Sequence, residues 1–301
     1  ITDKDERVVV VLVGGPTHHA DWSQVVKQAA QTLASVRKDG VAAGAFPHGA
    51  QSHRRGNFVA LPVGVSHGNG RLKPGNLLHP PERKELIQRL LDDKSIRRLA
   101  CYQSSVFSYY APKLYAQYCH TLLRVFERDE SLQRNFEDSI FPATSFNLGP
   151  ATVSIDHTDA SNVGYGLCAL TAVGSFDSRQ GGHLVLFDLG LMIEFPPGSV
   201  ILLPSGILRH GNTTVQDHEE RYSIAQYCAG GLLRWVKYGH QTAASIRNNN
   251  SKLKAKEILA GLDGDHADRV EEALGLFSTL DGLDSDRRTT YKDFATFLRT
   301  D

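Results

Sequence analysis

Three residues in the second half of the chain have the types and the spacing of a metal site. His157 and Asp159 lie two positions apart, so on an extended segment their side chains point the same way and can bind one ion. His210 follows a strand-and-turn sequence over 200–206 that brings the chain back toward the first pair. Two imidazoles and one carboxylate are the ligand set of non-haem Fe(II) oxygenases, which leaves positions open for a co-substrate and O₂.

Arg221 and Ser223 stand on the strand expected after His210 and point the same way. A guanidinium pairs bidentately with a carboxylate, so Arg221 fits the far carboxylate of a dicarboxylate co-substrate such as 2-oxoglutarate. Ser223 is positioned to donate a hydrogen bond to it, and Asn147 to reach the co-substrate. His183 begins a further strand, and for both Asn147 and His183 a structural role is the alternative. A cupin-like binding protein of the same fold would not require Arg221.

Short β-type runs separated by Gly and Pro surround these residues and must position them. This pattern predicts an antiparallel double-stranded β-helix, a jelly-roll or cupin-like core. Helical patterns before and after the core give an α+β fold class. The expected strands cover 151–155, 166–173, 183–187, 191–195, 199–203 and 222–227.

The chain divides on these patterns into three parts. Residues 1–140 form an N-terminal helical region packed on the core, residues 141–240 the jelly roll, and residues 241–301 a C-terminal helical tail. Within the first part, 41–80 is a basic Gly-rich loop, expected to be too rich in Gly and Pro for long elements. The expected helices start at Asp21 and cover 82–91, 95–128, 252–260 and 267–277.

The composition is that of a globular protein with balanced charge. The 301 residues hold 33 Lys and Arg against 33 Asp and Glu, which by itself argues against a nucleic-acid binder. The loop over 41–80 nevertheless carries Arg54, Arg55, Arg71 and Lys73 without an Asp or Glu. The 4 cysteines form no CxxC pair and indicate reduced thiols inside a cell. No apolar run of about 18 residues predicts a membrane helix.

The motifs around the metal site resemble a known family. His157-Thr158-Asp159-Ala160-Ser161-Asn162 is similar to the H-x-D-x-x-N signature of the TET/JBP DNA oxygenases. The run from Arg221 to Tyr227 is similar to their second signature, R-x-S with an aromatic residue six positions after the Arg. The arrangement resembles most of all the compact TET homologues of basidiomycete fungi such as Coprinopsis. The resemblance spans roughly residues 40–240.

The resemblance implies an Fe(II)- and 2-oxoglutarate-dependent dioxygenase acting on the methyl group of a base in methylated, duplex DNA. The family takes 5-methylcytosine to hydroxymethyl-, formyl- and carboxylcytosine, and ascorbate is the expected reductant. By motif position, Asn162 would hydrogen-bond the flipped base and Tyr227 would stack on it. The resemblance further implies a nuclear monomer.

One position departs from the family pattern. Ala229 stands where TET enzymes carry a His that contacts cytosine. This departure predicts room for a larger base, so N6-methyladenine is a second expected substrate. Hydroxylation of its N-methyl group gives an unstable carbinolamine that releases formaldehyde, which amounts to demethylation.

The basic residues of the 41–80 loop gain a role from this resemblance. Arg54, Arg55, Arg71 and Lys73 are expected to follow the phosphate backbone beside the active site. Two other functions stay open on the residues alone. A prolyl-type protein hydroxylase shares the His-x-Asp…His chelate, and a non-catalytic binding module would retain the metal only for folding.

Overall fold

The computed structural model describes residues 1–46, 52–53 and 55–297. The strands are β1 (Val11–Val13), β2 (Ser52–His53), β3 (Gly56–Asn57), β4 (Val59–Ser66), β5 (Gly75–Asn76), β6 (Ala143–Leu148), β7 (Cys168–Ser175), β8 (Leu184–Leu186), β9 (Leu191–Ile193), β10 (Val200–Leu203), β11 (His210–Asn212) and β12 (Glu220–Tyr227). The helices are α1 (Trp22–Ala42), α2 (Pro81–Asp92), α3 (Lys94–Tyr110), α4 (Pro112–Arg128), α5 (Gly230–Lys237), α6 (Ala243–Asn248), α7 (Lys252–Asp263), α8 (His266–Gly275) and α9 (Leu283–Phe297).

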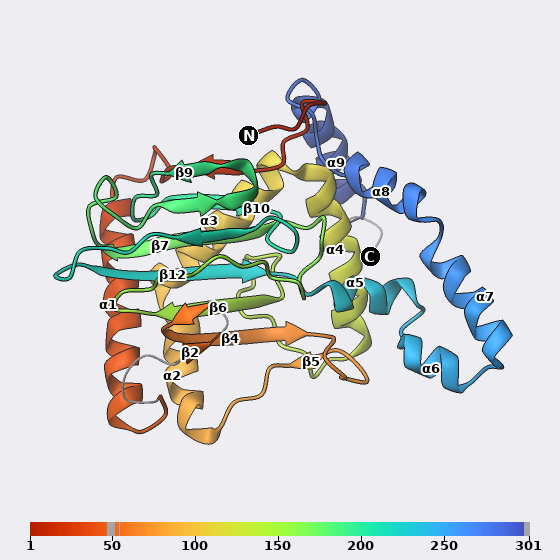
Figure 1. Ribbon diagram of the computed structural model, residues 1–301, viewed down its shortest axis with the longest axis horizontal. Helices are drawn as coiled ribbons and strands as arrows, with labels where there is room; N and C mark the ends of the chain where they lie inside the picture. The colour runs from red at the N-terminus through yellow and green to blue at the C-terminus, as the bar shows by residue number, and fades with distance from the viewer. Residues whose placement is uncertain (47–51, 54, 298–301) are drawn as a thin grey trace.

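Two antiparallel sheets form the centre of the molecule (Figure 1). In the described part of the chain, seven strands make the main sheet in the order β1-β10-β7-β12-β6-β4-β5, and three make a smaller sheet in the order β11-β8-β9. A hydrophobic cluster that includes Ala172 and Ile201 of the main sheet and Leu184 and Leu186 of the smaller one joins them. This confirms the predicted jelly roll within an α+β fold.

The segment 151–155, predicted as a strand, forms only one isolated bridge, between Ala151 and Arg221. Its backbone donors go to different partners, because the Thr152 N–H binds the Arg221 carbonyl and the Ile155 N–H binds the Arg55 carbonyl. Without one continuous partner strand, no ladder forms. The strand prediction at this position is wrong, and the segment instead connects the main sheet to the loop around Arg55.

The expectation that 41–80 forms no long element is also wrong. The eight residues of β4 pair along β6 in the main sheet, from Val59 opposite Leu148 to Gly64 opposite Ala143. The strand forms because its odd-numbered apolar residues, such as Leu61 and Val65, are completely buried. The division into three parts stays a prediction, although β1 and β4 of the first part belong to the main sheet.

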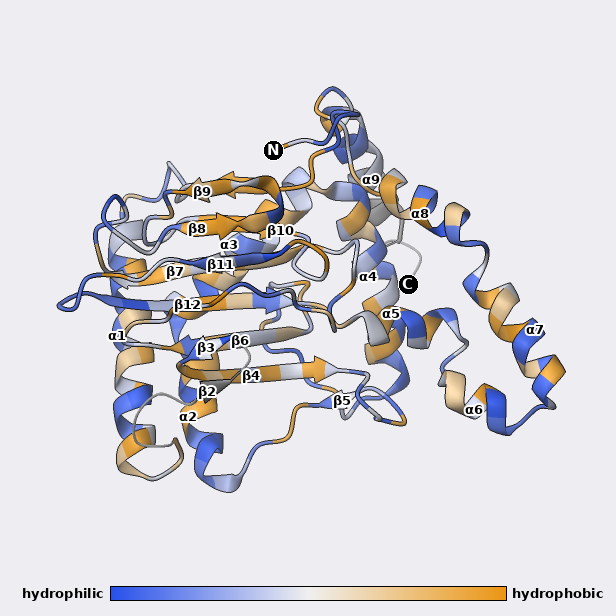
Figure 2. Cartoon of the chain, in the orientation of Figure 1, coloured by the Kyte–Doolittle hydropathy of each residue, from blue (hydrophilic) through white to orange (hydrophobic). Residues whose placement is uncertain are grey.

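Helices α1, α2 and α3 cover one side of the main sheet, and α1 and α3 pack on β7 (Figure 1). The apolar side of α1, which includes Val26, Leu33 and Val36, is buried in a cluster with Leu61 and Ile224 of the sheet. Figure 2 shows the resulting alternation of hydrophobic and hydrophilic residues along α1. These helices thus bury one side of the main sheet and stabilise it.

A buried amide network joins α3 to β12. Gln226 Nε2 donates to Gln103 Oε1 at 2.8 Å and to the Ala100 carbonyl at 3.0 Å. Gln103 Nε2 in turn donates to the Ile224 carbonyl at 3.0 Å, and Ser139 Oγ donates to Gln226 Oε1 at 2.8 Å. Because each buried amide has its partners, the network stabilises β12 in one position against the helix.

The C-terminal helices α6 and α7 extend from the body of the molecule beyond α5, and α8 and α9 return toward the N-terminus (Figure 1). A small cluster of Tyr238, Ile246 and Ala255 attaches α6 and α7 to the end of α5. We call α5, α6 and α7 the C-terminal arm. Among the described helices, none combines the length and the hydrophobicity that crossing a membrane requires.

Candidate metal centre

The structure brings His157, Asp159 and His210 together. One potential ligand atom from each residue lies within 4.8 Å of those of the other two. His157 Nε2 is 3.8 Å from Asp159 Oδ1, and His210 Nε2 is 3.9 Å from Asp159 Oδ2. Both histidines are buried and Asp159 is partly buried, so an ion here would be largely shielded from solvent.

The two histidines are oriented by their own backbone. His157 Nδ1 lies 2.7 Å from the Ile155 carbonyl, and His210 Nδ1 lies 2.9 Å from the Leu208 carbonyl. A carbonyl only accepts, so each Nδ1 carries the proton and each Nε2 is left with a lone pair for a metal. Burial and the neighbouring His210 lower the pKa of His157, which favours the neutral ring that a metal binds.

Asp159 is held by a tight turn around Ser205. The Asp159 N–H donates to the Ser205 carbonyl at 2.7 Å, and the Asn162 N–H donates to the Asp159 carbonyl at 2.8 Å. Asn162 Nδ2 donates to Ser205 Oγ at 3.0 Å. Ser205 therefore holds both the backbone of Asp159 and the side-chain amide of Asn162, which is expected to read a base.

Arg221 is the most unusual group near these ligands, since it is only 2% exposed. Its Nη1 donates to Thr152 Oγ1 at 3.0 Å and to the Thr152 carbonyl at 3.2 Å, while Nε has no partner. Among the described residues no carboxylate forms an ion pair with it. Burial lowers the pKa of Arg221 to about 10, because charge without a counter-charge is unfavourable in the interior.

The neighbours of Arg221 form a cavity with the three candidate ligands. Ser223 Oγ accepts a hydrogen bond of 2.8 Å from Asn147 Nδ2, across the paired strands β12 and β6. Gly182, with a φ of 70°, packs against Phe176 and Arg221, where a Cβ would meet the Phe176 ring at 2.8 Å and the Arg221 Cδ at 3.3 Å. The glycine lets the loop before β8 pack closely against Phe176 and the aliphatic part of Arg221.

This arrangement fits Fe(II) and 2-oxoglutarate. Two imidazole nitrogens and a carboxylate oxygen are the donors that non-haem Fe(II) prefers. The buried guanidinium with an unpartnered Nε lacks an anion, and the far carboxylate of 2-oxoglutarate would supply one in the same cavity.

Arg55 and Tyr227 also belong to this region. Arg55, predicted to follow DNA phosphates, lines the same cavity as His157 and Asp159. Burial raises the pKa of Tyr227 to about 12, the charge of Arg55 acts to lower it, and Asp159 acts to raise it. Tyr227 itself is not among the residues that line the metal cavity.

The remaining predicted residues lie elsewhere. Arg71 lines a groove next to α5, and Asn162 lines a larger groove beside the metal cavity. Lys73 is exposed and pairs with Asp129, with Nζ 2.7 Å from Oδ2. His183 Nδ1 lies 3.1 Å from Thr213 Oγ1 and does not line the metal cavity. Arg54 lies outside the described residues.

Ala229, the position that departs from the family pattern, lies beside Asn162. It is 3% exposed, forms a bridge with Asn162, and packs in a cluster with Leu232 and Tyr118. It is not among the residues lining the metal cavity. Room for a larger base beside this position therefore stays a prediction.

Sequence reasoning missed Thr152 and Ser205. Thr152 is buried and accepts both hydrogen bonds of Arg221, but it lies in the segment 151–155, which was wrongly predicted as a strand. Ser205 stands in the turn before His210, and its position after a buried strand was the only signal for it.

Comparisons with known proteins agree with this fold. No family model matches the chain, and no curated protein does. The solved structure of NgTET1 in complex with 5mC DNA has a TM-score of 0.53 and 13% identity, over 76% of this chain and 75% of that chain. An oxidoreductase of the 2OG-Fe(II) oxygenase family from Burkholderia pseudomallei has a TM-score of 0.37 and 19% identity, over 73% of this chain and 85% of that chain. The chain therefore has the jelly-roll fold of NgTET1, and the predicted resemblance to the TET/JBP family is confirmed in the fold.

Proposed function

We propose that this protein is an Fe(II)- and 2-oxoglutarate-dependent dioxygenase that oxidises the methyl group of a modified base in DNA. One observation carries the proposal. The ligand atoms of His157, Asp159 and His210 converge in the same cavity as Arg221, a buried cation that lacks a counter-charge. A metal triad beside a buried receptor for a carboxylate is what this reaction class needs.

One group of residues in the cavity would bind the metal, and a second group would bind the co-substrate. His157, Asp159 and His210 would hold Fe(II), which, together with O₂ and 2-oxoglutarate, supplies oxidation of a C–H bond while 2-oxoglutarate becomes succinate and CO₂. Arg221 and Ser223 would bind the far carboxylate. Their burial excludes water from this ion pair, which strengthens it.

A base is the substrate that the neighbouring residues favour. Tyr227 offers an aromatic ring at the end of β12, on the same side of the strand as Arg221 and Ser223. Asn162, three residues after Asp159, offers an amide to the polar edge of the base. An enzyme that acts on a base inside a duplex must flip it out and read it by stacking and hydrogen bonds, and NgTET1 is a neighbour in complex with 5mC DNA.

The expected product depends on the base. Oxidation of 5-methylcytosine would proceed to 5-hydroxymethyl-, 5-formyl- and 5-carboxylcytosine, whereas N6-methyladenine would lose its methyl group as formaldehyde. We propose the nucleus as the location, because DNA is the substrate, and a monomer as the active form.

The test is mass spectrometry of duplexes carrying either methylated base, incubated with the protein, Fe(II), 2-oxoglutarate and ascorbate. We expect at least one methylated base to be consumed with release of succinate. Asp159→Ala is the control that removes a metal ligand. The proposal fails if a folded, iron-loaded protein consumes neither base. Succinate formation stimulated by a proline peptide but not by DNA would assign a protein hydroxylase instead.

A further inference from the structure

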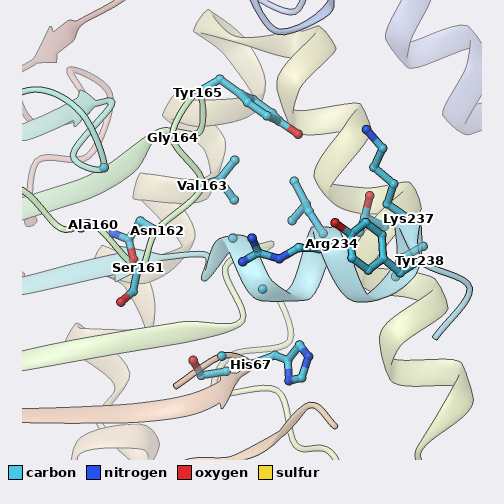
Figure 3. Close-up of a pocket in the computed structure, with 18 of the residues that line it drawn as sticks. His67, Ala160, Ser161, Asn162, Val163, Gly164, Tyr165, Arg234, Lys237 and Tyr238 are labelled. Atoms are coloured by element: carbon cyan, nitrogen blue, oxygen red, sulfur yellow. The ribbon is translucent and has the colours of Figure 1, made fainter. Parts of the chain in front are cut away.

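Three adjoining hollows lie along the C-terminal arm, and together we call them the groove. Its first part has a volume of about 800 Å³ and is bordered by Asn162, Arg234 and Lys237. Figure 3 shows Arg234 extending from α5 toward the loop that carries Asn162. The second part, of about 400 Å³, shares His67 and Arg234 with the first and continues to Arg247. Arg247 also borders a third hollow against α7. The shared residues show that the three parts adjoin one another.

The groove begins next to the proposed catalytic residues. Asn162 borders the first part, and its backbone N–H donates to the Asp159 carbonyl at 2.8 Å. Gly231, at the start of α5, lies directly against the His67 carbonyl, where any Cβ would clash with that backbone atom. This close approach holds α5, and with it Arg234, beside the end of β4.

The arm that forms this groove is strongly basic. From residue 222 to residue 256 the chain contains no Asp or Glu. In the same span it carries six cations, which are Arg234, Lys237, Arg247, Lys252, Lys254 and Lys256. Five of them border the groove, all except Lys254. Arg71, a basic side chain of the first half of the chain, also borders the second part.

These cations are available to a ligand. Arg234, Lys237 and Arg247 are exposed, and none forms an ion pair with a carboxylate within the described ranges of the chain. Exposed arginines on other surfaces, such as Arg89 and Arg209, pair with aspartates. The single acidic side chain bordering the first part, Asp263, accepts a hydrogen bond of 2.7 Å from Tyr238 Oη.

The positive charge of the groove acts on the titratable groups that it surrounds. Burial lowers the pKa of His67, and the charges of Arg234 and Arg71 lower it further. Burial and the hydrogen-bonded Asp263 raise the pKa of Tyr238, whereas the charges of Arg234 and Arg247 act to lower it. Arg71, Arg234 and Arg247 thus contribute positive potential to the same groove.

We propose that this groove binds the phosphodiester backbone of the DNA strand that carries the flipped base, with Arg234 and Arg247 as phosphate contacts and the α7 lysines extending the track. Phosphate contacts by Lys and Arg position a protein on DNA without reading sequence. Asn162 borders the first part of the groove, so the DNA backbone next to a base bound at Asn162 would lie in the groove. This inference rests on the proposed function and gives the C-terminal arm a role in it.

The test uses the full chain and two variants of equal charge change. Arg234→Glu/Arg247→Glu reverses two cations in the groove. Lys27→Glu/Lys38→Glu reverses two exposed lysines of α1, which lies at the opposite end of the main sheet from the arm (Figure 1). Affinity for a fluorescent 5-methylcytosine duplex is measured by anisotropy, without O₂, across about 50–200 mM salt. Arg247→Ser is a milder variant, and circular dichroism verifies that each protein is folded.

We expect the groove variant to bind at least about tenfold more weakly than the wild type, with the salt slope reduced by about 0.9 for each phosphate that is no longer neutralised. The α1 variant should bind within about twofold of the wild type, and Arg247→Ser should fall between the two variants. The inference is overturned if the groove variant binds like the wild type, or if both double variants weaken DNA binding equally.

The two proposals fail separately. If wild-type affinity for DNA depends on the groove but neither methylated base is consumed, the proposed reaction fails and the groove inference stands. If methylated DNA is oxidised equally well by wild type and groove variant, the reaction stands and the inference fails. If the groove variant loses affinity for RNA of the same sequence but not for DNA, the groove serves RNA and the inference is wrong.

Discussion

His157 and His210 exchange a reciprocal pair of backbone hydrogen bonds, 3.1 Å from the His157 N–H to the His210 carbonyl and 2.9 Å in the other direction. Their rings lie 4.3 Å apart between centroids. The pairing joins the segment before Asp159 to β11 of the smaller sheet, so it sets the distance between the two candidate ligands through the backbone. The geometry of the site is therefore a property of strand pairing.

Asp159→Ala should abolish turnover and most Fe(II) binding, because two imidazoles alone hold a metal weakly. Equilibrium dialysis with Fe(II) under anaerobic conditions measures binding, and mass spectrometry measures products. Circular dichroism should not change, since both sheets are built without the Asp159 side chain. Chelation of wild-type protein should remove activity and added Fe(II) should restore it. Full activity of Asp159→Ala would contradict the ligand assignment.

Arg221→Ala should raise the KM for 2-oxoglutarate about 30-fold or more, which corresponds to about 2 kcal/mol for a buried charge-assisted pair. Arg221→Lys should be intermediate, because an ammonium supplies charge without the bidentate geometry. The shift of Tm that 2-oxoglutarate produces in the wild type should be absent in Arg221→Ala. An unchanged KM in that variant would remove Arg221 from co-substrate binding.

Tyr227→Ala should weaken the use of methylated DNA by about 1–3 kcal/mol, the range measured for stacking of a base on an aromatic side chain. Tyr227→Phe keeps the ring and should retain most activity. The KM for 2-oxoglutarate should change little in either variant, which separates base binding from co-substrate binding. Equal losses in Tyr227→Phe and Tyr227→Ala would show that the hydroxyl acts, and stacking would not explain the effect.

The ion pair between Lys73 and Asp129 predicts a specific dependence on pH. Hydrogen bonds from Lys73 and Ser131 lower the pKa of Asp129 to about 2. A carboxyl group with a lowered folded-state pKa stabilises the fold above its unfolded value, and that contribution is lost as pH falls from about 4 to about 2. Lys73→Met should raise the Asp129 pKa, measured by NMR titration.

The same variant tests the predicted phosphate contact of Lys73. Because the Lys73 ammonium is already paired with Asp129, Lys73→Met should change DNA affinity less than Arg234→Glu/Arg247→Glu does. Anisotropy at one salt concentration measures both variants. A decrease in affinity equal to that of the groove variant would restore the phosphate contact that the sequence predicts for Lys73.

The candidate ligands could be predicted from sequence because they depend on local rules. His157 and Asp159 share a side through the two-residue period of extended chain, and His210 follows a recognisable buried strand. The position of Arg55 could not be predicted, because it depends on where a long connection returns in space. The loop over 41–80 enters the main sheet as β4, and Arg55, just before this strand, lines the metal cavity itself.

The basic groove was hidden from sequence reasoning for a related reason. The cations of the arm are spread over three helices, and their common direction depends on how α6 and α7 attach to α5 through Tyr238, Ile246 and Ala255. Helical periodicity describes each helix by itself and contains no information about the angle between them. The sequence shows these cations, but it does not show that they border the same groove as Asn162.

The amide network between Gln103 and Gln226 disfavours a folding error in which β12 pairs in the wrong register. A slip of β12 by one residue would turn Gln226 toward the metal cavity and Arg221 toward α3. Such a slip would break the amide pair on one side of the strand and the receptor for the co-substrate on the other. Two interactions therefore depend on the same register of β12. The Gln103–Gln226 pair stabilises that register during folding, and a dicarboxylate bound at Arg221 would stabilise it further in the folded protein.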